Sequence, residues 1–157
     1  MHPRSIAIFA SLLAAAASVE AFGVARVVNK CPFAVSLWTV GETTEGPFVL
    51  CDGGGSYAEP MTIDPISCGR SIKITIPEDG LYTAAPQMNF AYNLDGDDVW
   101  YDLSDVFGHP FAGHRATLAS DNCDCPSLEW MHGVPPPESQ VRSCYSPADD
   151  VILTLCA

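Results

Sequence analysis

The sequence predicts an all-β fold, an antiparallel β-sandwich held together by disulfide bonds. Short segments rich in β-branched and aromatic residues recur along the chain, and several alternate apolar with polar positions, as in residues 71–76. Clusters of Gly, Pro, Asn and Asp separate these segments. No stretch of twelve residues keeps the period of an amphipathic helix. Short strands divided by frequent turns are typical of a sandwich.

Residues 1–21 are expected to be a secretory signal peptide. A short basic start precedes the apolar run IAIFASLLAAAA, and Val19 and Ala21 are the small residues of a cleavage site. The run is shorter than the roughly 20 residues that span a bilayer. The alternative is a buried N-terminal helix. Cleavage would leave residues 22–157 as one domain, in agreement with the chain length.

Six segments of that domain are expected to be strands: residues 24–28, 33–40, 71–76, 90–94, 99–103 and 151–155. Turns are expected at residues 52–56, 77–80 and 95–98, where Gly and Asp cluster. Residues 119–147 hold five prolines and three cysteines. Because proline removes backbone donors, this segment is expected to be an irregular Pro/Cys-rich loop pinned by a disulfide.

The formal net charge of −12 limits the partners of the protein. A nucleic-acid binder needs a surplus of Lys and Arg on some face, and this chain has only seven such residues. After residue 21 no apolar segment approaches membrane-spanning length, and anionic lipid would repel the acidic surface. We therefore expect a secreted, soluble protein that neither binds nucleic acid nor inserts into a membrane.

Seven cysteines without paired CxxC motifs favour an exported, disulfide-bonded protein over a cytosolic thiol or zinc protein. Because seven is odd, at most three bridges form within the chain, and one cysteine is left free or bonded to a partner. Cys123 and Cys125 cannot both pair easily with nearby Cys144, so one of the two is expected to be left over. We expect a monomer, with a covalent dimer through the odd cysteine as the alternative.

Several segments, in order along the chain, resemble the thaumatin-like proteins. Residues 27–38 look like the opening strand pair of that family, and the ending Leu-Thr-Leu-Cys-Ala also fits it. Residues 90–94 resemble a further strand, and residues 99–108 are similar to its Tyr-Asp-Val-Ser-x-Val-x-Gly run. By size and by the GGGSY and SIKI segments, the chain is more similar still to the small fungal branch. That branch contains the Blastomyces yeast-phase-specific secreted proteins and the antigenic thaumatin-like proteins.

The resemblance implies a thaumatin-like sandwich in which a bridge between Cys31 and Cys156 ties the first strand to the last. It also implies a local bridge between Cys51 and Cys68 that closes the GGGSY loop. The similarity covers most of residues 24–118 and the final strand, but not residues 119–147.

Larger thaumatin-like proteins have an acidic cleft associated with β-1,3-glucan binding and, in some members, weak glucanase activity. Asp102 matches the first aspartate of that cleft, and the next falls on Phe107, with Asp105 nearby in a different register. The glutamate of the family falls on Asn89, which cannot serve as a general acid or a nucleophile. Lys73 is a possible cation in place of the family's arginine. The alternative for Asp102 is a structural carboxylate that caps a turn or bonds nearby groups.

Aromatic residues are the other candidate ligand contacts. Trp130 lies in the Pro-rich loop, where it would either stack on a sugar or anchor a protein interface, or else pack its own loop. Trp38, Trp100 and Tyr101 lie on expected strands and are predicted to be core residues.

No cofactor and no metal site is expected. Residues 95–98 lack the ligand spacing of an EF-hand and are predicted to form a solvated turn. The spacing of His109, His114 and His132 matches no zinc pattern, so these histidines are expected at the surface.

The leading interpretation is a non-catalytic protein of the cell wall or cell surface. It would bind a β-glucan-type polysaccharide or an extracellular protein, and could act as an antigen or a host-interaction factor. Its candidate ligand contacts are Asp102, Asp105, Lys73 and Trp130. The alternative is a weak endo-β-1,3-glucanase that uses Asp102 with Asp105 or another carboxylate of a reduced cleft. A third interpretation, a secreted inhibitor of foreign enzymes or membranes, has no inhibitory loop to support it.

Overall fold

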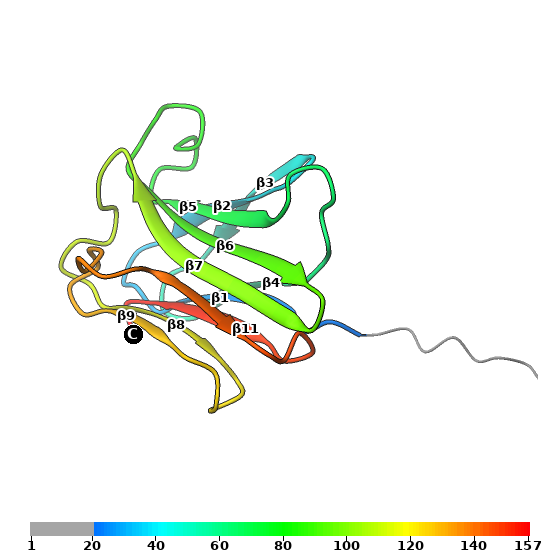
Figure 1. Ribbon diagram of the computed structural model, residues 1–157. Coiled ribbons are helices and arrows are strands. Elements are labelled where there is room, and N and C mark those ends of the chain that lie inside the picture. Colours follow the sequence, from blue (N-terminus) through cyan, green and yellow to red (C-terminus); the bar gives the residue numbers. More distant parts are fainter. Residues whose placement is uncertain (1–20) are drawn as a thin grey trace, which may run out of the picture.

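The computed structural model describes residues 21–157, which form two stacked β-sheets (Figure 1). The all-β sandwich predicted from the sequence is confirmed. The expected leader lies, except for its last residue, outside the described residues. No helix that could cross a membrane occurs between residues 21 and 157. The strands are β1 (Val24–Asn29), β2 (Val35–Val40), β3 (Thr44–Leu50), β4 (Gly55–Pro60), β5 (Arg70–Thr75), β6 (Gln87–Asp95), β7 (Asp98–Val106), β8 (Ala116–Ser120), β9 (Leu128–Trp130), β10 (Val141–Cys144) and β11 (Val151–Leu155).

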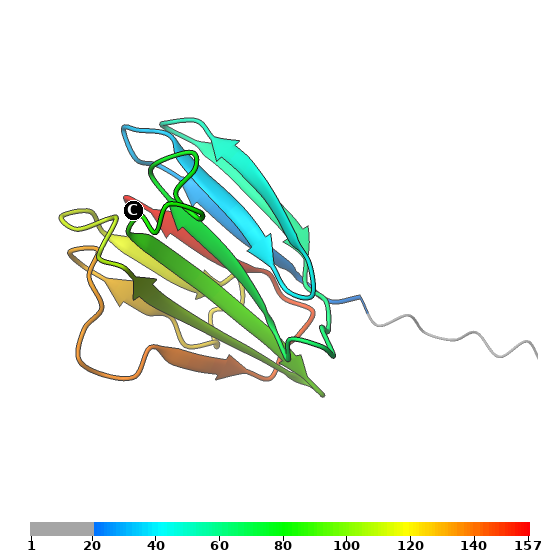
Figure 2. The same ribbon diagram turned by 90° about the horizontal axis from the view of Figure 1, so that it is seen from above.

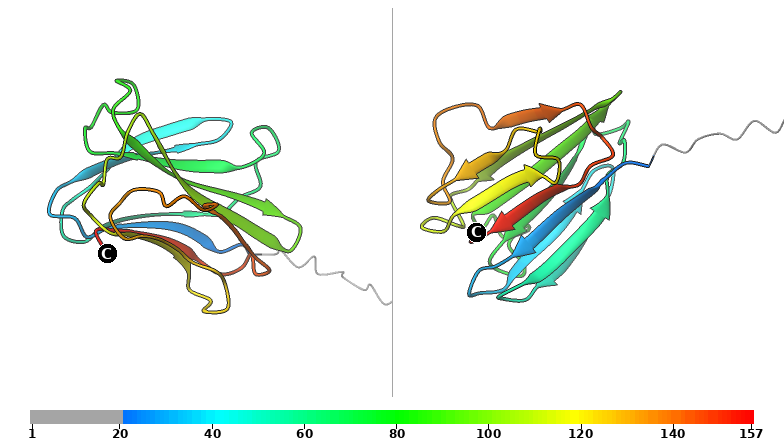
Figure 3. Two further views of the ribbon diagram at one scale, coloured as in Figure 1. Left: turned by 60° about the vertical axis from the view of Figure 1, so that its left-hand side comes forward. Right: turned by 90° about the horizontal axis from the view of Figure 1, so that it is seen from below.

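The two sheets enclose one apolar core. The six-stranded sheet has the order β10-β7-β6-β5-β2-β3 and is seen from above in Figure 2. The five-stranded sheet has the order β4-β1-β11-β8-β9 and is seen from below in the right panel of Figure 3. Alternate residues of the central strands point inward, so that on β7 Val99, Tyr101 and Leu103 are buried in the core.

All six expected strands are present, as β1, β2, β5, β6, β7 and β11. The prediction that residues 119–147 contain no sheet was wrong, because β9 and β10 lie there. Each is an edge strand of its sheet. An edge strand needs backbone partners on one side only, so the neighbouring prolines do not prevent pairing.

The first and last strands lie side by side and run in the same direction. β1 pairs with β11 in parallel, from Ala25 opposite Val151 to Asn29 opposite Leu155, whereas the other pairs are antiparallel. Because both strands end at the same edge of the sheet, the cysteines that follow them meet. Cys31 and Cys156 form the bridge that the family resemblance implied, with their Cα atoms 4.9 Å apart.

The expected bridge between Cys51 and Cys68 is not formed, and both cysteines are free and exposed. Both β3 and β5 pair with β2. Cys51 follows β3 and lies near the Val35 end of β2, whereas Cys68 precedes β5 and lies near the Val40 end. The length of β2, about 17 Å, therefore separates the two ends. Cysteines whose Cα atoms lie more than about 7 Å apart cannot be joined without backbone movement.

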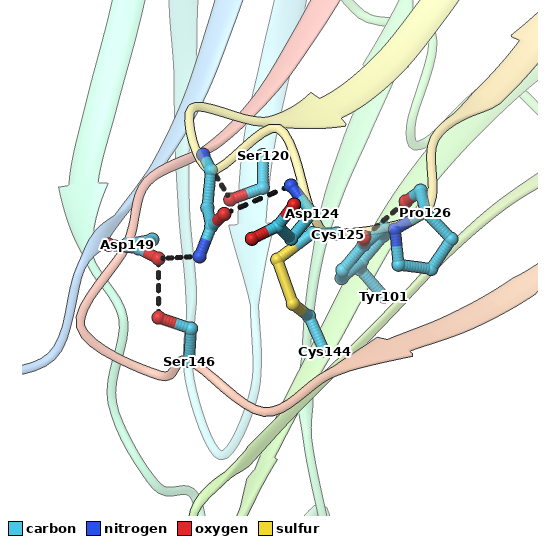
Figure 4. The surroundings of a disulfide bond; sticks show 9 residues. Tyr101, Ser120, Asp124, Cys125, Pro126, Cys144, Ser146 and Asp149 are labelled. Carbon is cyan, nitrogen blue, oxygen red and sulfur yellow. Dashed lines mark hydrogen bonds between the residues drawn. A yellow bond between two sulfur atoms is a disulfide. The ribbon is translucent and has the colours of Figure 1, made fainter.

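The remaining bridge joins Cys125 to Cys144 and attaches β10 to the segment before β9 (Figure 4). This resolves the choice between Cys123 and Cys125, and Cys123 is left free. The Tyr101 hydroxyl donates a hydrogen bond to the Pro126 carbonyl beside the bridge. Three cysteines are thus unpaired, rather than the single one expected.

Candidate functional site

The six-stranded sheet has a second face, opposite the core, which we call the outer face. Ile72, Phe90 and Leu103 point into the core, so the residues that alternate with them on β5, β6 and β7 belong to the outer face. The strand register places these residues in two neighbouring rows across the sheet. One row is Trp38, Lys73, Asn89 and Ser104, and the next is Val40, Ser71, Ala91 and Asp102.

A shallow hollow of about 190 Å³ lies on this face, and we call it the Trp100 hollow. Trp100 is 43% exposed there, and its predicted place in the core was wrong. Asp102, Asn93 and Val141 line the same hollow, as does the free Cys68. The hollow thus combines an accessible aromatic ring with a carboxylate and an amide, whose groups accept and donate hydrogen bonds.

Asp102 lies in the middle of β7 and therefore does not cap a turn. Within residues 21–157 no hydrogen bond to the Asp102 carboxyl is found, and the Oγ of nearby Ser104 accepts one from the Asn89 amide at 3.5 Å. Partial burial raises the pKa of the Asp102 carboxyl above its usual value. Asp102 therefore has neither the turn-capping nor the hydrogen-bonding role among the described residues, and it lines the Trp100 hollow.

Asp105 lies on the opposite side of the sheet from Asp102. The two residues are three positions apart on one strand, and side chains alternate between faces, so an odd step reverses the direction. The Asp105 side chain is only 3% exposed, and one of its oxygens lies 2.9 Å from the His109 Nδ1. The other oxygen is buried and has no hydrogen-bond partner within residues 21–157. Burial raises the Asp105 pKa to about 6, an effect that His109 partly offsets.

Lys73 lies on the same outer face as Asp102, but the strand register does not make the two residues neighbours. Lys73 lies opposite Asn89, which lies opposite Ser104, so two strand spacings and a two-residue step separate it from Asp102. These steps correspond to about 12 Å between Cα atoms. Lys73 therefore extends the polar surface beside the hollow.

Trp130 is not an exposed ligand contact. Its side chain is fully buried, and its indole N–H donates a hydrogen bond to Gln140 Oε1 at 2.6 Å. Of the two roles considered from the sequence, the packing of its own loop is the one observed. Tyr101 is buried in the core as predicted, whereas Trp38 is buried on the outer face, where its ring meets Tyr82.

A signal for Trp100 was present in the sequence. Residues 98–104 alternate polar and apolar positions, with Val99, Tyr101 and Leu103 forming the apolar set. Trp100 falls in the other set, together with Asp102, and strict alternation would have placed it on the outer face. Between residues 21 and 157, no three His, Cys, Asp or Glu side chains gather in a metal-binding arrangement.

Comparisons with known proteins agree with this architecture. The sequence model of the Blastomyces yeast-phase-specific protein family matches residues 12–157. An antigenic thaumatin-like protein of Arthroderma benhamiae is 26% identical over 155 residues, which cover 96% of this chain and 75% of that protein. The secreted thaumatin-like protein calA of Emericella nidulans is 31% identical over 107 residues, which cover 65% of this chain and 60% of that protein.

A solved structure has the same fold. The protein elicitor MoHrip2 from Magnaporthe oryzae aligns with a TM-score of 0.70 and 24% sequence identity, covering 86% of this chain and 99% of that one. At that identity, the likeness supports the arrangement of strands and not a shared activity.

Proposed function

The chain belongs to the Blastomyces yeast-phase-specific protein family, and from this premise we propose that it is a secreted protein that binds a cell-wall polysaccharide of the β-glucan type. The Trp100 hollow on the outer face is the proposed binding site. The names of two relatives, one an antigenic and one a secreted thaumatin-like protein, support an extracellular location and a role as an antigen.

The observation that carries the proposal is the exposed Trp100 ring beside Asp102 and Asn93. A sugar ring has an apolar face that packs on an aromatic side chain, and it has hydroxyl groups at its rim. A carboxylate accepts hydrogen bonds from such hydroxyls, and an amide both accepts and donates. Since both polar residues are on strands, their backbone positions are fixed before a ligand arrives.

The geometry supports binding rather than hydrolysis. A glycosidase of the usual type places two carboxyl groups about 5–9.5 Å apart around one glycosidic bond. Asp105 was the candidate partner of Asp102, but it faces the opposite side of the sheet and is buried against His109. The position that carries glutamate in larger thaumatin-like proteins is Asn89, which neither ionises nor donates a proton.

Retention on insoluble β-1,3-glucan tests the proposal. The wild-type chain is expected to bind, and Trp100→Ala is expected to weaken binding about 5- to 30-fold, the effect of losing about 1–2 kcal/mol of aromatic contact. Met131→Ala is a matched control, because Met131 is 59% exposed and lines a different hollow. Equal retention of the three proteins would reject the site. No retention of the wild type on glucan would reject the polysaccharide and leave an extracellular protein as the ligand class.

The free cysteines allow a second, site-resolved test. Cys68 lines the Trp100 hollow, whereas Cys51 and Cys123 lie elsewhere, and all three thiols are exposed. A soluble β-1,3-gluco-oligosaccharide is expected to slow alkylation of Cys68 and to leave the other two rates unchanged. Uniform rates with and without the sugar would contradict binding at this hollow.

A further inference from the structure

A second hollow lies beside the outer face, at the edge away from Trp100. It measures about 460 Å³ and is lined by Pro47 of β3 and by Glu78, Asp79 and Tyr82 of the segment between β5 and β6. In Figure 1 this segment, drawn in green, rises above the six-stranded sheet. We call it the Tyr82 hollow.

The aromatic wall of this hollow has a rigid support. Tyr82 is 74% exposed, and its ring meets the fully buried ring of Trp38 edge to face, with centroids 6.3 Å apart. Trp38 packs so closely on β3 that a Cβ at Gly46 would lie 2.8 Å from its Cδ1. The buried indole N–H of Trp38 has no hydrogen-bond partner among the described residues. The buried Trp38 ring thus packs against one side of Tyr82, whose ring is otherwise exposed to solvent.

The segment that carries Tyr82 is itself fastened to the sheet. The Thr75 hydroxyl donates to the Pro77 carbonyl at 2.6 Å, and the Tyr82 N–H donates to the Asp79 carbonyl at 3.0 Å. Gly80 lies directly against the Thr75 side chain, where any larger residue would collide. The backbone that carries Tyr82, Glu78 and Asp79 is therefore attached to the sheet.

We propose that the Tyr82 hollow is a second sugar subsite, so that one polysaccharide chain crosses the outer face from the Trp100 hollow to the Tyr82 hollow. The inference rests on the proposed function of the Trp100 hollow. Its chemistry repeats that of the first hollow, because an exposed aromatic ring lies beside the Glu78 and Asp79 carboxylates, which accept hydroxyl hydrogen bonds.

The surface between the two hollows suits an extended ligand. Trp38 and Trp100 are three strands and four residues apart in the register, which corresponds to about 20 Å between Cα atoms. Ser71 and Ala91 lie along that diagonal, and their small side chains leave room for a sugar chain on the surface of the sheet. Lys73 lies beside it and supplies a donor for sugar hydroxyls.

This arrangement predicts that affinity depends on the length of the sugar chain. A disaccharide or trisaccharide is too short to reach both hollows, whereas a hexasaccharide spans them. Isothermal titration with β-1,3-gluco-oligosaccharides of two to six units is expected to show a rise of about tenfold or more once both subsites are occupied, because the second contact becomes intramolecular. Tyr82→Ala is expected to remove this rise and to leave the trisaccharide affinity unchanged.

Two further variants make the result decisive. Tyr82→Phe keeps the ring and is expected to retain the rise, which separates the loss of stacking from a disturbed loop. Trp100→Ala is expected to weaken short and long ligands alike. A wild-type chain that binds the trisaccharide and the hexasaccharide equally well, or a Tyr82→Ala variant that keeps the rise, overturns the second subsite while the Trp100 hollow stands. Absence of binding to every oligosaccharide overturns the proposed function and the second subsite together.

Discussion

Replacement of Asp105 by Asn is expected to stabilise the protein at neutral pH and not at acidic pH. The folded state raises the Asp105 pKa from 3.8 to about 6, because the carboxyl is buried. The folded chain therefore binds this proton more tightly than the unfolded chain does. Its contribution to the free energy of unfolding is present below about pH 4 and is lost as the pH rises to about 6 and beyond.

The size of the effect follows from the pKa difference. About two pKa units at about 1.4 kcal/mol each give about 3 kcal/mol between acidic and neutral pH. The 3% exposure of the side chain and its unpartnered oxygen agree with a cost of this order. An amide at position 105 keeps an acceptor for His109 and carries no charge, so the pH dependence that Asp105 gives to the free energy of unfolding disappears.

Urea unfolding at pH 4 and at pH 7.5, with the disulfides intact, measures the effect. Because other carboxylates also titrate, the difference between wild type and D105N at each pH isolates Asp105. D105N is expected to be more stable than wild type by up to about 3 kcal/mol at pH 7.5 and nearly equal to it at pH 4. Asp95→Asn, at an exposed position on β6, is the control and should shift both values equally. A D105N variant destabilised by the same amount at both pH values would refute the reasoning.

Three other predictions follow from the bridges and from one close contact. Removal of the Cys31–Cys156 bridge, whose cysteines are 125 positions apart, is expected to lower the free energy of unfolding by about 5 kcal/mol, and equal urea midpoints would contradict this. Gly46→Ala is expected to cost about 1–3 kcal/mol in the same assay, because its φ of +131° suits only glycine and the added Cβ would press on Trp38. Alkylation without reductant should modify the three free cysteines, Cys51, Cys68 and Cys123, as counted by mass spectrometry. A smaller number of modified cysteines would indicate another bridge or a covalent dimer.

The sequence was most informative about the interior of the sheets. The six strands predicted from it all lie inside the sheets rather than at their edges, where alternation reflects burial on one face. The four edge strands, β3, β4, β9 and β10, were all missed, and so was the interior strand β8. β3 is exposed at nearly every residue, so it has no alternation to detect. Edge strands depend on hydrogen bonds to one neighbour, a relation that local composition does not encode.

The candidate site was predictable only in part, for a similar reason. Asp102 and Lys73 could be named from the family pattern, and both lie on the outer face. Trp130 could not be placed, because its segment looked irregular, whereas it ends the edge strand β9 and is buried in the core. Tyr82 gave no signal, since its position depends on how one turn folds back onto Trp38.

The chemistry of the outer face depends on the alternation of side chains along β7. Trp100, Asp102 and Ser104 share that face, whereas the three-residue step to Asp105 places the second carboxylate among core residues. The other carboxylates named beside this face, Glu78 and Asp79, line the Tyr82 hollow. Trp38, which supports that hollow, is three strands and two residues from Asp102 in the register, about 16 Å between Cα atoms. Such a spacing suits two contacts along one sugar chain, the binding mode that we propose for this face.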